Sequence, residues 1–119
     1  MQEKTRDHFE IIRGDTAVIP IWIFRRSSRD SDARYPVILT SDMTFEVILP
    51  GGVSATTAGA QVTFVAGSVP YIIAKFSTTQ TPLLTVKKFA TIVVRVTKAD
   101  GTVKTYQKKK VLDIVDRDN

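Results

Sequence analysis

Short runs of alternating apolar and polar residues predict a chain built from β-strands. In the clearest run, 88–97, apolar residues recur at every second position and would line one face of an extended strand. No segment longer than a turn repeats its apolar residues at a helical spacing. Turn-forming residues separate the runs at intervals of about ten residues. On the apolar side of 88–97 lie Ala90, Ile92, Val94 and Val96, and Thr91, Arg95 and Thr97 help to form the other side.

The run 88–97 and the run 103–115 are joined across Asp100-Gly101. Asp-Gly between two alternating runs is a strong hairpin signal, because glycine tolerates the positive φ that the turn requires. The sequence therefore predicts a long antiparallel ribbon. Since one face of this ribbon is apolar, it needs a second sheet to cover it.

The most apolar stretch of the chain is 16–24. Proline lacks the N–H that a strand ladder uses, so Pro20 predicts a strand that is at a sheet edge or bulged near its middle. Both faces of this strand are apolar, which predicts that one faces the core and the other faces a loop of the same domain or another molecule. One face carries Ala17, Ile19, Ile21 and Ile23, and the other carries Val18, Trp22 and Phe24.

Further strands are expected at 8–13, 43–49, 61–65 and 69–76, separated by a polar loop at 25–33, a small flexible stretch at 54–60 and a connection at 77–85. About seven short strands favour an all-β, two-sheet antiparallel β-sandwich, with a partly closed barrel as the alternative. We expect a flexible N-terminal arm at 1–6 and a single β-sandwich domain at 7–119.

The 119-residue chain has ordinary apolar (43%) and charged (24%) fractions for a soluble globular protein. It has no cysteine, which excludes disulfides and thiolate metal sites. No apolar run approaches the roughly 20 residues of a membrane span, and the N-terminal residues are too charged for a signal peptide. We therefore expect a soluble protein made in the cytoplasm, with no membrane partner.

The net charge of +5 raises the possibility of a nucleic-acid partner. The basic residues, however, form separate clusters at Arg25-Arg26, Lys87-Lys88 and 108–110. In a strand, consecutive lysines point to opposite faces, so the cluster 108–110 would not form one patch. A solvated strand, or an edge strand that lysines protect against edge-to-edge aggregation, explains it better than a nucleic-acid interface.

No catalytic, cofactor or metal site is expected. His8 is the only histidine, and no nucleophile motif accompanies it. Asp30 and Asp32 have a spacing seen in calcium loops, but the other ligands of such a loop are missing. The tripeptide 13–15, Arg-Gly-Asp, is explained as a turn between two strands rather than an adhesion motif.

Three aromatic residues could stack nucleic-acid bases in a small barrel. Each of them is explained more simply as a core residue or as part of a cross-strand pair. They are Trp22, Tyr71 and Tyr106.

Three motifs in this order resemble the immunoglobulin-like modules of tailed bacteriophages, especially the N-terminal domain of siphophage upper baseplate proteins. They are Gly14-Asp15-Thr16 before an apolar strand, the strand from Phe45-Glu46-Val47 to Pro50, and the hairpin from Val94 to Asp100-Gly101-Thr102. The similarity extends over roughly residues 9–115. It implies an immunoglobulin-like β-sandwich with no catalytic residues, repeated in a symmetric virion structure.

We therefore predict a non-enzymatic structural component of a bacteriophage particle, made in the host bacterial cytoplasm and located in the virion. It would belong to the baseplate, tail, neck, or a capsid-attached fibre or decoration. Its partners would be other phage structural proteins and further copies of itself. The alternatives are a carbohydrate- or receptor-binding β-sandwich and a nucleic-acid-binding small β-barrel. The expected interface residues are Trp22, Phe24, Arg25, Arg26, Lys108 and Lys110.

Overall fold

The structure, a computed structural model, describes residues 8–26 and 34–116, with 25–26 and 34–36 described only in their backbone. Within these residues the chain forms ten strands and one three-residue 3-10 helix, and no helix has the length and apolar composition of a membrane span. The elements are β1 (Phe9–Ile12), β2 (Ala17–Ile21), β3 (Phe24–Arg26), β4 (Arg34–Pro36), β5 (Thr44–Leu49), β6 (Val53–Thr56), β7 (Val62–Val65), β8 (Tyr71–Phe76), η1 (Thr81–Leu83), β9 (Lys87–Thr97) and β10 (Val103–Val115).

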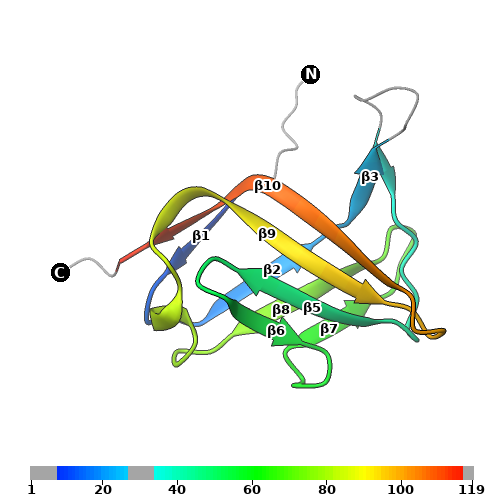
Figure 1. Ribbon diagram of the computed structural model, residues 1–119, viewed down its shortest axis with the longest axis horizontal. Coiled ribbons are helices and arrows are strands. Elements are labelled where there is room, and N and C mark those ends of the chain that lie inside the picture. Colours follow the sequence, from blue (N-terminus) through cyan, green and yellow to red (C-terminus); the bar gives the residue numbers. More distant parts are fainter. Residues whose placement is uncertain (1–7, 27–33, 117–119) are drawn as a thin grey trace.

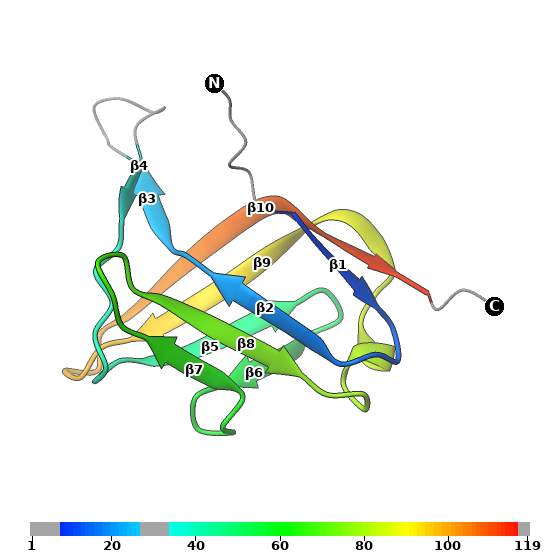
Figure 2. The same ribbon diagram turned by 180° about the vertical axis from the view of Figure 1, so that it is seen from behind.

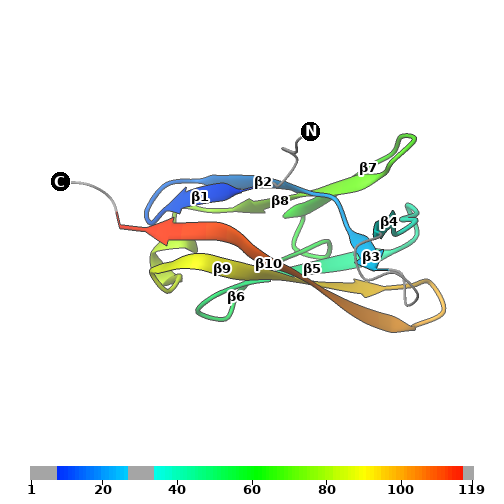
Figure 3. The same cartoon turned by 90° about the horizontal axis from the view of Figure 1, so that it is seen from above.

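Eight of these strands form two sheets that pack face to face (Figures 1 and 3). The larger sheet has the strand order β1-β10-β9-β5-β6, and the smaller has the order β2-β8-β7. The remaining two strands, β3 and β4, form a short hairpin that projects from the body (Figure 2). The predicted all-β, two-sheet architecture is confirmed, with more strands than the seven expected.

The predicted hairpin is present as β9 and β10, which pair antiparallel from Thr97↔Val103 onward. Its loop has three residues, since the Lys98 N–H donates to the Thr102 carbonyl (2.8 Å). Gly101 takes the left-handed conformation (φ 91°), which is the role expected of the glycine in such a loop.

The alternation of apolar residues selects the inner faces as predicted. Ala90, Ile92, Val94 and Val96 of β9 are at most 3% exposed, and 17, 19, 21 and 23 are at most 7% exposed. One hydrophobic core therefore lies between the two sheets. Burial of this apolar surface is the main favourable contribution to folding.

Pro20 lies at the edge of the smaller sheet, because β2 pairs with β8 alone. The register is regular through the proline (Pro20↔Ile73), so the edge alternative is correct and the bulge alternative is not. The missing N–H of Pro20 removes no sheet hydrogen bond on this free side.

The expectation of a purely antiparallel sandwich was wrong, because β1 pairs parallel with the end of β10 (Phe9↔Leu112). After β1 the chain turns at Gly14 (φ 99°) and enters the other sheet as β2. Since β2 pairs with β8, β1 is left to extend the larger sheet beside β10. Parallel pairing requires a long connection, and here the whole domain provides it.

Two segments expected to be irregular are strands. Within 54–60, Ser54–Thr56 belongs to β6, because Val53 and Ala55 point into the core at 8% and 0% exposure. Arg25 and Arg26, placed in a polar loop by the sequence, belong to β3 and pair with β4. The rest of that loop, 27–33, and the expected arm 1–6 lie outside the described residues.

The strand β10 is interrupted by a bulge. Its register with β9 shifts between Lys108 and Leu112, and Lys110 takes a positive φ of 60°. A second shift follows between Leu112 and Ile114, opposite Phe89, whose φ is 55°. The lysines 108–110 therefore do not follow the simple alternation of a regular strand.

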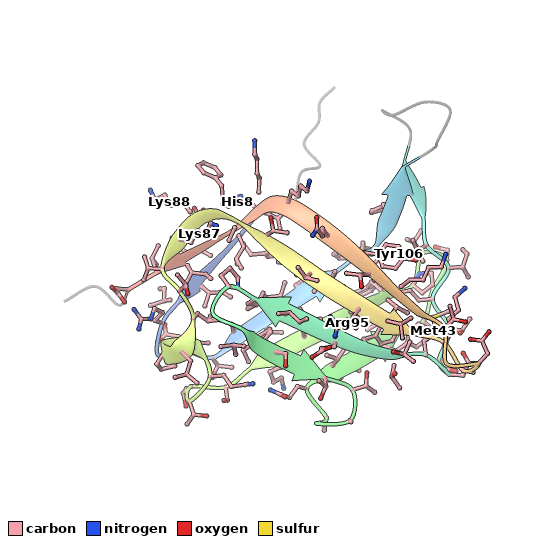
Figure 4. The ribbon with its side chains drawn as sticks, viewed as in Figure 1. His8, Met43, Lys87, Lys88, Arg95 and Tyr106 are labelled. Carbon is pink, nitrogen blue, oxygen red and sulfur yellow. The ribbon has the colours of Figure 1, made fainter. Side chains whose placement is uncertain are left out.

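Asp113 stabilises the second bulge. One carboxylate oxygen accepts a hydrogen bond from the Phe89 N–H (2.9 Å), and the other lies 3.1 Å from Nε2 of His8. The His8 and Phe89 rings also form a T-shaped contact, with centroids 6.1 Å apart. The Phe89 N–H, followed by His8, lowers the pKa of Asp113 below its ordinary value of 3.8. Figure 4 labels His8, Lys87 and Lys88 in this region.

We expect this carboxylate to stabilise the folded chain near neutral pH and to lose this effect in acid. Because its pKa is lower in the folded state, its contribution is fully present above pH 3.8 and is lost as the pH falls through the folded pKa. The free energy of unfolding, measured with urea, should therefore fall less between pH 6 and pH 2 for Asp113→Asn than for the native chain. The exposed Glu10→Gln on β1 is the control, and equal acid sensitivity of Asp113→Asn and the native chain would contradict the assignment.

Candidate protein–protein interface

Trp22, Phe24 and Lys108 come together where β2 ends and β3 begins. The Lys108 ammonium donates a hydrogen bond to the main-chain carbonyl of Trp22 (2.7 Å). The same nitrogen lies 6.0 Å from the centroid of the Phe24 ring, within range of a cation–π contact. Three of the six predicted interface residues therefore form one cluster.

The topology explains why a lysine of β10 reaches β2. β1 pairs only with Leu112–Val115, so the preceding half of β10 has no strand of the larger sheet between it and the end of β2. Lys108 lies opposite the buried Ile92, so its side chain leaves the strand on the side of the smaller sheet. Its hydrogen bond to the Trp22 carbonyl links β10 of the larger sheet to the segment between β2 and β3.

Trp22 stacks on Tyr71, with ring centroids 4.5 Å apart and planes 23° apart. The register Ile21↔Ile72 places the two rings beside each other at the end of the pairing between β2 and β8. The simpler explanation of these residues as a cross-strand aromatic pair is thus confirmed. Trp22 is half-buried by this contact, whereas the Phe24 side chain is 44% exposed.

The cluster continues into an apolar outer face of the smaller sheet. Val18 is 54% exposed, and the register places it opposite the exposed Lys75, on the same side away from the core as Pro20, Ile73 and Tyr71. Val65, opposite Tyr71, belongs to the same side. The expectation that the second strand is apolar on both faces is correct. We call this surface the outer apolar face; its residues are Val18, Pro20, Trp22, Val65, Tyr71 and Ile73.

The other three predicted interface residues lie at the margins of this cluster. Lys110 is exposed at the bulge of β10, two residues after Lys108. Arg25 and Arg26 follow Phe24 in β3, and their side chains lie outside the described residues.

The remaining candidate residues have structural roles or lie elsewhere. The Arg13 guanidinium pairs with Asp116 (2.7 Å) and donates to the Pro82 carbonyl, and the backbone turns at Gly14 as predicted. Asp30 and Asp32 lie outside the described residues. Within the described part of the chain, no group of three or more His, Asp or Glu side chains is arranged to hold a metal ion.

Sequence reasoning expected core or cross-strand roles for Trp22 and Tyr71 but did not pair them with each other, and it missed the hydrogen bond from Lys108 to the Trp22 carbonyl. The pairing of β2 with β8 was the signal needed for the first, since it aligns the two aromatic residues. The second depends on where β1 ends beside β10, which no local pattern encodes.

Comparison with models of known protein families found no match, and comparison with curated protein sequences found none. The function is therefore argued from the fold, the exposed surface and the sequence motifs.

Proposed function

We propose that this chain is a non-enzymatic structural component of a bacteriophage particle, an immunoglobulin-like module that works by protein–protein assembly. Further copies of the chain and other phage structural proteins would be its partners. Its place would be in the baseplate, tail, neck, or a capsid-attached fibre or decoration.

The strand order supports the immunoglobulin-like assignment. In immunoglobulin variable-type domains the sheet of strands G, F and C is extended by C′ and faces a sheet that contains B, E and D. Numbered in chain order, β10-β9-β5-β6 and β2-β8-β7 follow the same two orders. In the constant type the first strand lies in the sheet of B, E and D, whereas β1 here joins β10; the hairpin β3–β4 is also inserted between β2 and β5.

The observation that carries the assembly role is the outer apolar face together with Phe24. Val18 and Phe24 are exposed and the other residues of this face are half-buried, so apolar surface reaches solvent here beside basic residues, as it does at many protein-binding surfaces. Trp22 and Tyr71 offer large rings there, and Lys108 holds the main chain of Trp22 in place. Such preorganised aromatic residues frequently dominate binding energy.

The proposed function is tested in two steps. The mass of the purified chain in solution, from light scattering, reports whether it forms a closed oligomer. Mass spectrometry of gradient-purified phage particles then reports whether its peptides are present in a constant ratio to the other particle proteins. Absence of the chain from purified particles would refute the assignment to the virion.

Phe24→Ser should weaken assembly without unfolding the domain. Because Phe24 is 44% exposed, its replacement removes little core packing, yet it removes apolar contact from the proposed interface. We expect an interface cost of about 1–3 kcal/mol, seen as at least a fivefold weaker association by light scattering or particle incorporation.

Phe89→Ser is the matched control, because Phe89 is also exposed (62%) but lies at the second bulge, beyond the Lys108↔Ile92 pair and outside the cluster. It should leave association unchanged. Equal effects of the two substitutions, or no effect of Phe24→Ser on association, would show that the Phe24 surface is not the interface.

A further inference from the structure

One half of β10 has a free edge. Its residues Val103–Lys108 pair with β9 on one side, and β1 covers only Leu112–Val115 on the other. Among the described residues, no strand pairs with the second side of Val103–Lys108. The strand is extended there and its register is regular, so this edge is already shaped to receive another strand.

The hairpin geometry identifies the groups that this edge presents. The hydrogen bond from the Lys98 N–H to the Thr102 carbonyl makes 98 and 102 a bonded pair. Bonded and non-bonded pairs alternate along an antiparallel ladder, so 104, 106 and 108 face β9. The N–H and C=O groups of Val103, Thr105 and Gln107 are therefore directed to the free side.

This edge is strongly basic. The segment 103–110 contains four lysines and no acidic residue. The side chains of Lys104, Lys109 and Lys110 are exposed, and Lys98 lies at the start of the adjoining loop. The two Asp residues nearest to these lysines already have other partners: Asp100 accepts the Thr102 N–H within the loop, and Asp113 accepts the Phe89 N–H and pairs with His8.

The charge selects the kind of partner. Two copies of this edge would bring eight lysines together, which disfavours pairing of β10 with β10 of a second copy. An extended segment with acidic side chains would satisfy both the free ladder groups and the lysines. We propose that the free edge of β10 at Val103–Lys108 binds an extended acidic segment of a partner protein by strand addition.

This inference extends the proposed assembly role to a second surface and names the chemistry of the partner. The test uses the purified full chain and needs no particle, so its failure would leave the particle assay above unaffected. Conversely, absence of the chain from particles would leave binding at this edge intact.

The probe is a nine-residue peptide of alternating valine and glutamate, compared with a peptide in which lysine replaces each glutamate. We expect the acidic peptide to bind at least tenfold more tightly by calorimetry or NMR titration, and to slow amide hydrogen exchange at Val103, Thr105 and Gln107. Its affinity should fall as salt is added, because the lysine contribution is screened.

Two pairs of variants test the mechanism. Thr105→Pro removes a free-side N–H without removing a bond to β9, and should lower the affinity for the acidic peptide at least tenfold. Thr105→Val keeps this N–H and should leave the affinity unchanged. The double variant Lys104→Glu, Lys109→Glu should also lower the affinity for the acidic peptide, whereas Lys75→Glu on the other sheet should have little effect on it. Circular dichroism and thermal unfolding show which variants remain folded.

Several results would overturn the proposal. These are equal binding of the two peptides, exchange protection on β2 or β7 instead of β10, or equal affinities of Thr105→Pro and Thr105→Val. Tighter binding of a thymidine oligonucleotide than of the acidic peptide would assign the lysines to nucleic acid instead. Pairing of β10 between two copies, detected as a doubled mass that Thr105→Pro abolishes, would assign the edge to self-association.

Discussion

Replacing Leu112 by alanine is expected to lower the free energy of unfolding by about 3–5 kcal/mol. Leu112 is fully buried and lies where three strands meet, opposite Phe9 of β1 and Ala90 of β9. Because ladders hold β10 on both sides at this position, the strands cannot close around the space that the side chain leaves. The cost therefore includes both the lost burial and an unfilled cavity.

Urea unfolding of the purified variant measures this cost. Val103→Ala, a truncation in the same strand at a position that is 51% exposed, is the control and should change the free energy of unfolding by less than about 1 kcal/mol. If Leu112→Ala lowered the free energy of unfolding no more than Val103→Ala does, the packing of β1 against the end of β10 described above would be wrong.

The alternation of β9 shows why the sequence predicted the sheets well. A strand with one buried face must repeat its apolar residues at every second position, so the inner face was visible in the sequence without any tertiary knowledge. The turn at Gly101 was equally visible, because few residues other than glycine adopt its positive φ. Pro20 restricted β2 to an edge or a bulge for the same local reason.

The pairing of β1 was not visible, because it depends on residues far apart in the chain. Nothing near Phe9 indicates that its neighbour is Leu112, and an isolated four-residue strand fits either sheet. β6 was missed for a different reason. Its small residues resemble a flexible loop, yet Ala55 is fully buried because its short side chain fits between the sheets.

The candidate interface was predicted in part. Trp22 and Phe24 were identified because they follow the outward side of the most apolar strand, and this side is indeed the exposed one at Phe24. Lys108 was selected for its charge, but the structure gives it a bond to a backbone carbonyl that charge alone does not suggest. The free edge of β10 required knowing where β1 stops, which is a property of the assembled sheet.

Thr81→Val is expected to lower the free energy of unfolding by about 2–4 kcal/mol, although valine has nearly the same shape. Thr81 is the one buried polar residue among the described side chains, at 0% exposure. Its hydroxyl accepts a hydrogen bond from the Gly14 N–H (2.9 Å) and donates one to the Asp15 carbonyl (2.8 Å). It thereby joins η1 to the turn between β1 and β2, more than 60 residues away.

The size of the effect follows from what the substitution leaves behind. A methyl group in place of the hydroxyl removes the partner of both main-chain groups at a site closed to water, and each such loss costs about 1–3 kcal/mol. Thr81→Ser keeps the hydroxyl and loses only a methyl group, so it should be milder than Thr81→Val. Thr79→Val, at an exposed position in the same connection, should be nearly neutral. Urea unfolding of the three variants gives the order, and a Thr81→Val chain as stable as Thr81→Ser would show that the hydroxyl does not hold the turn at Gly14.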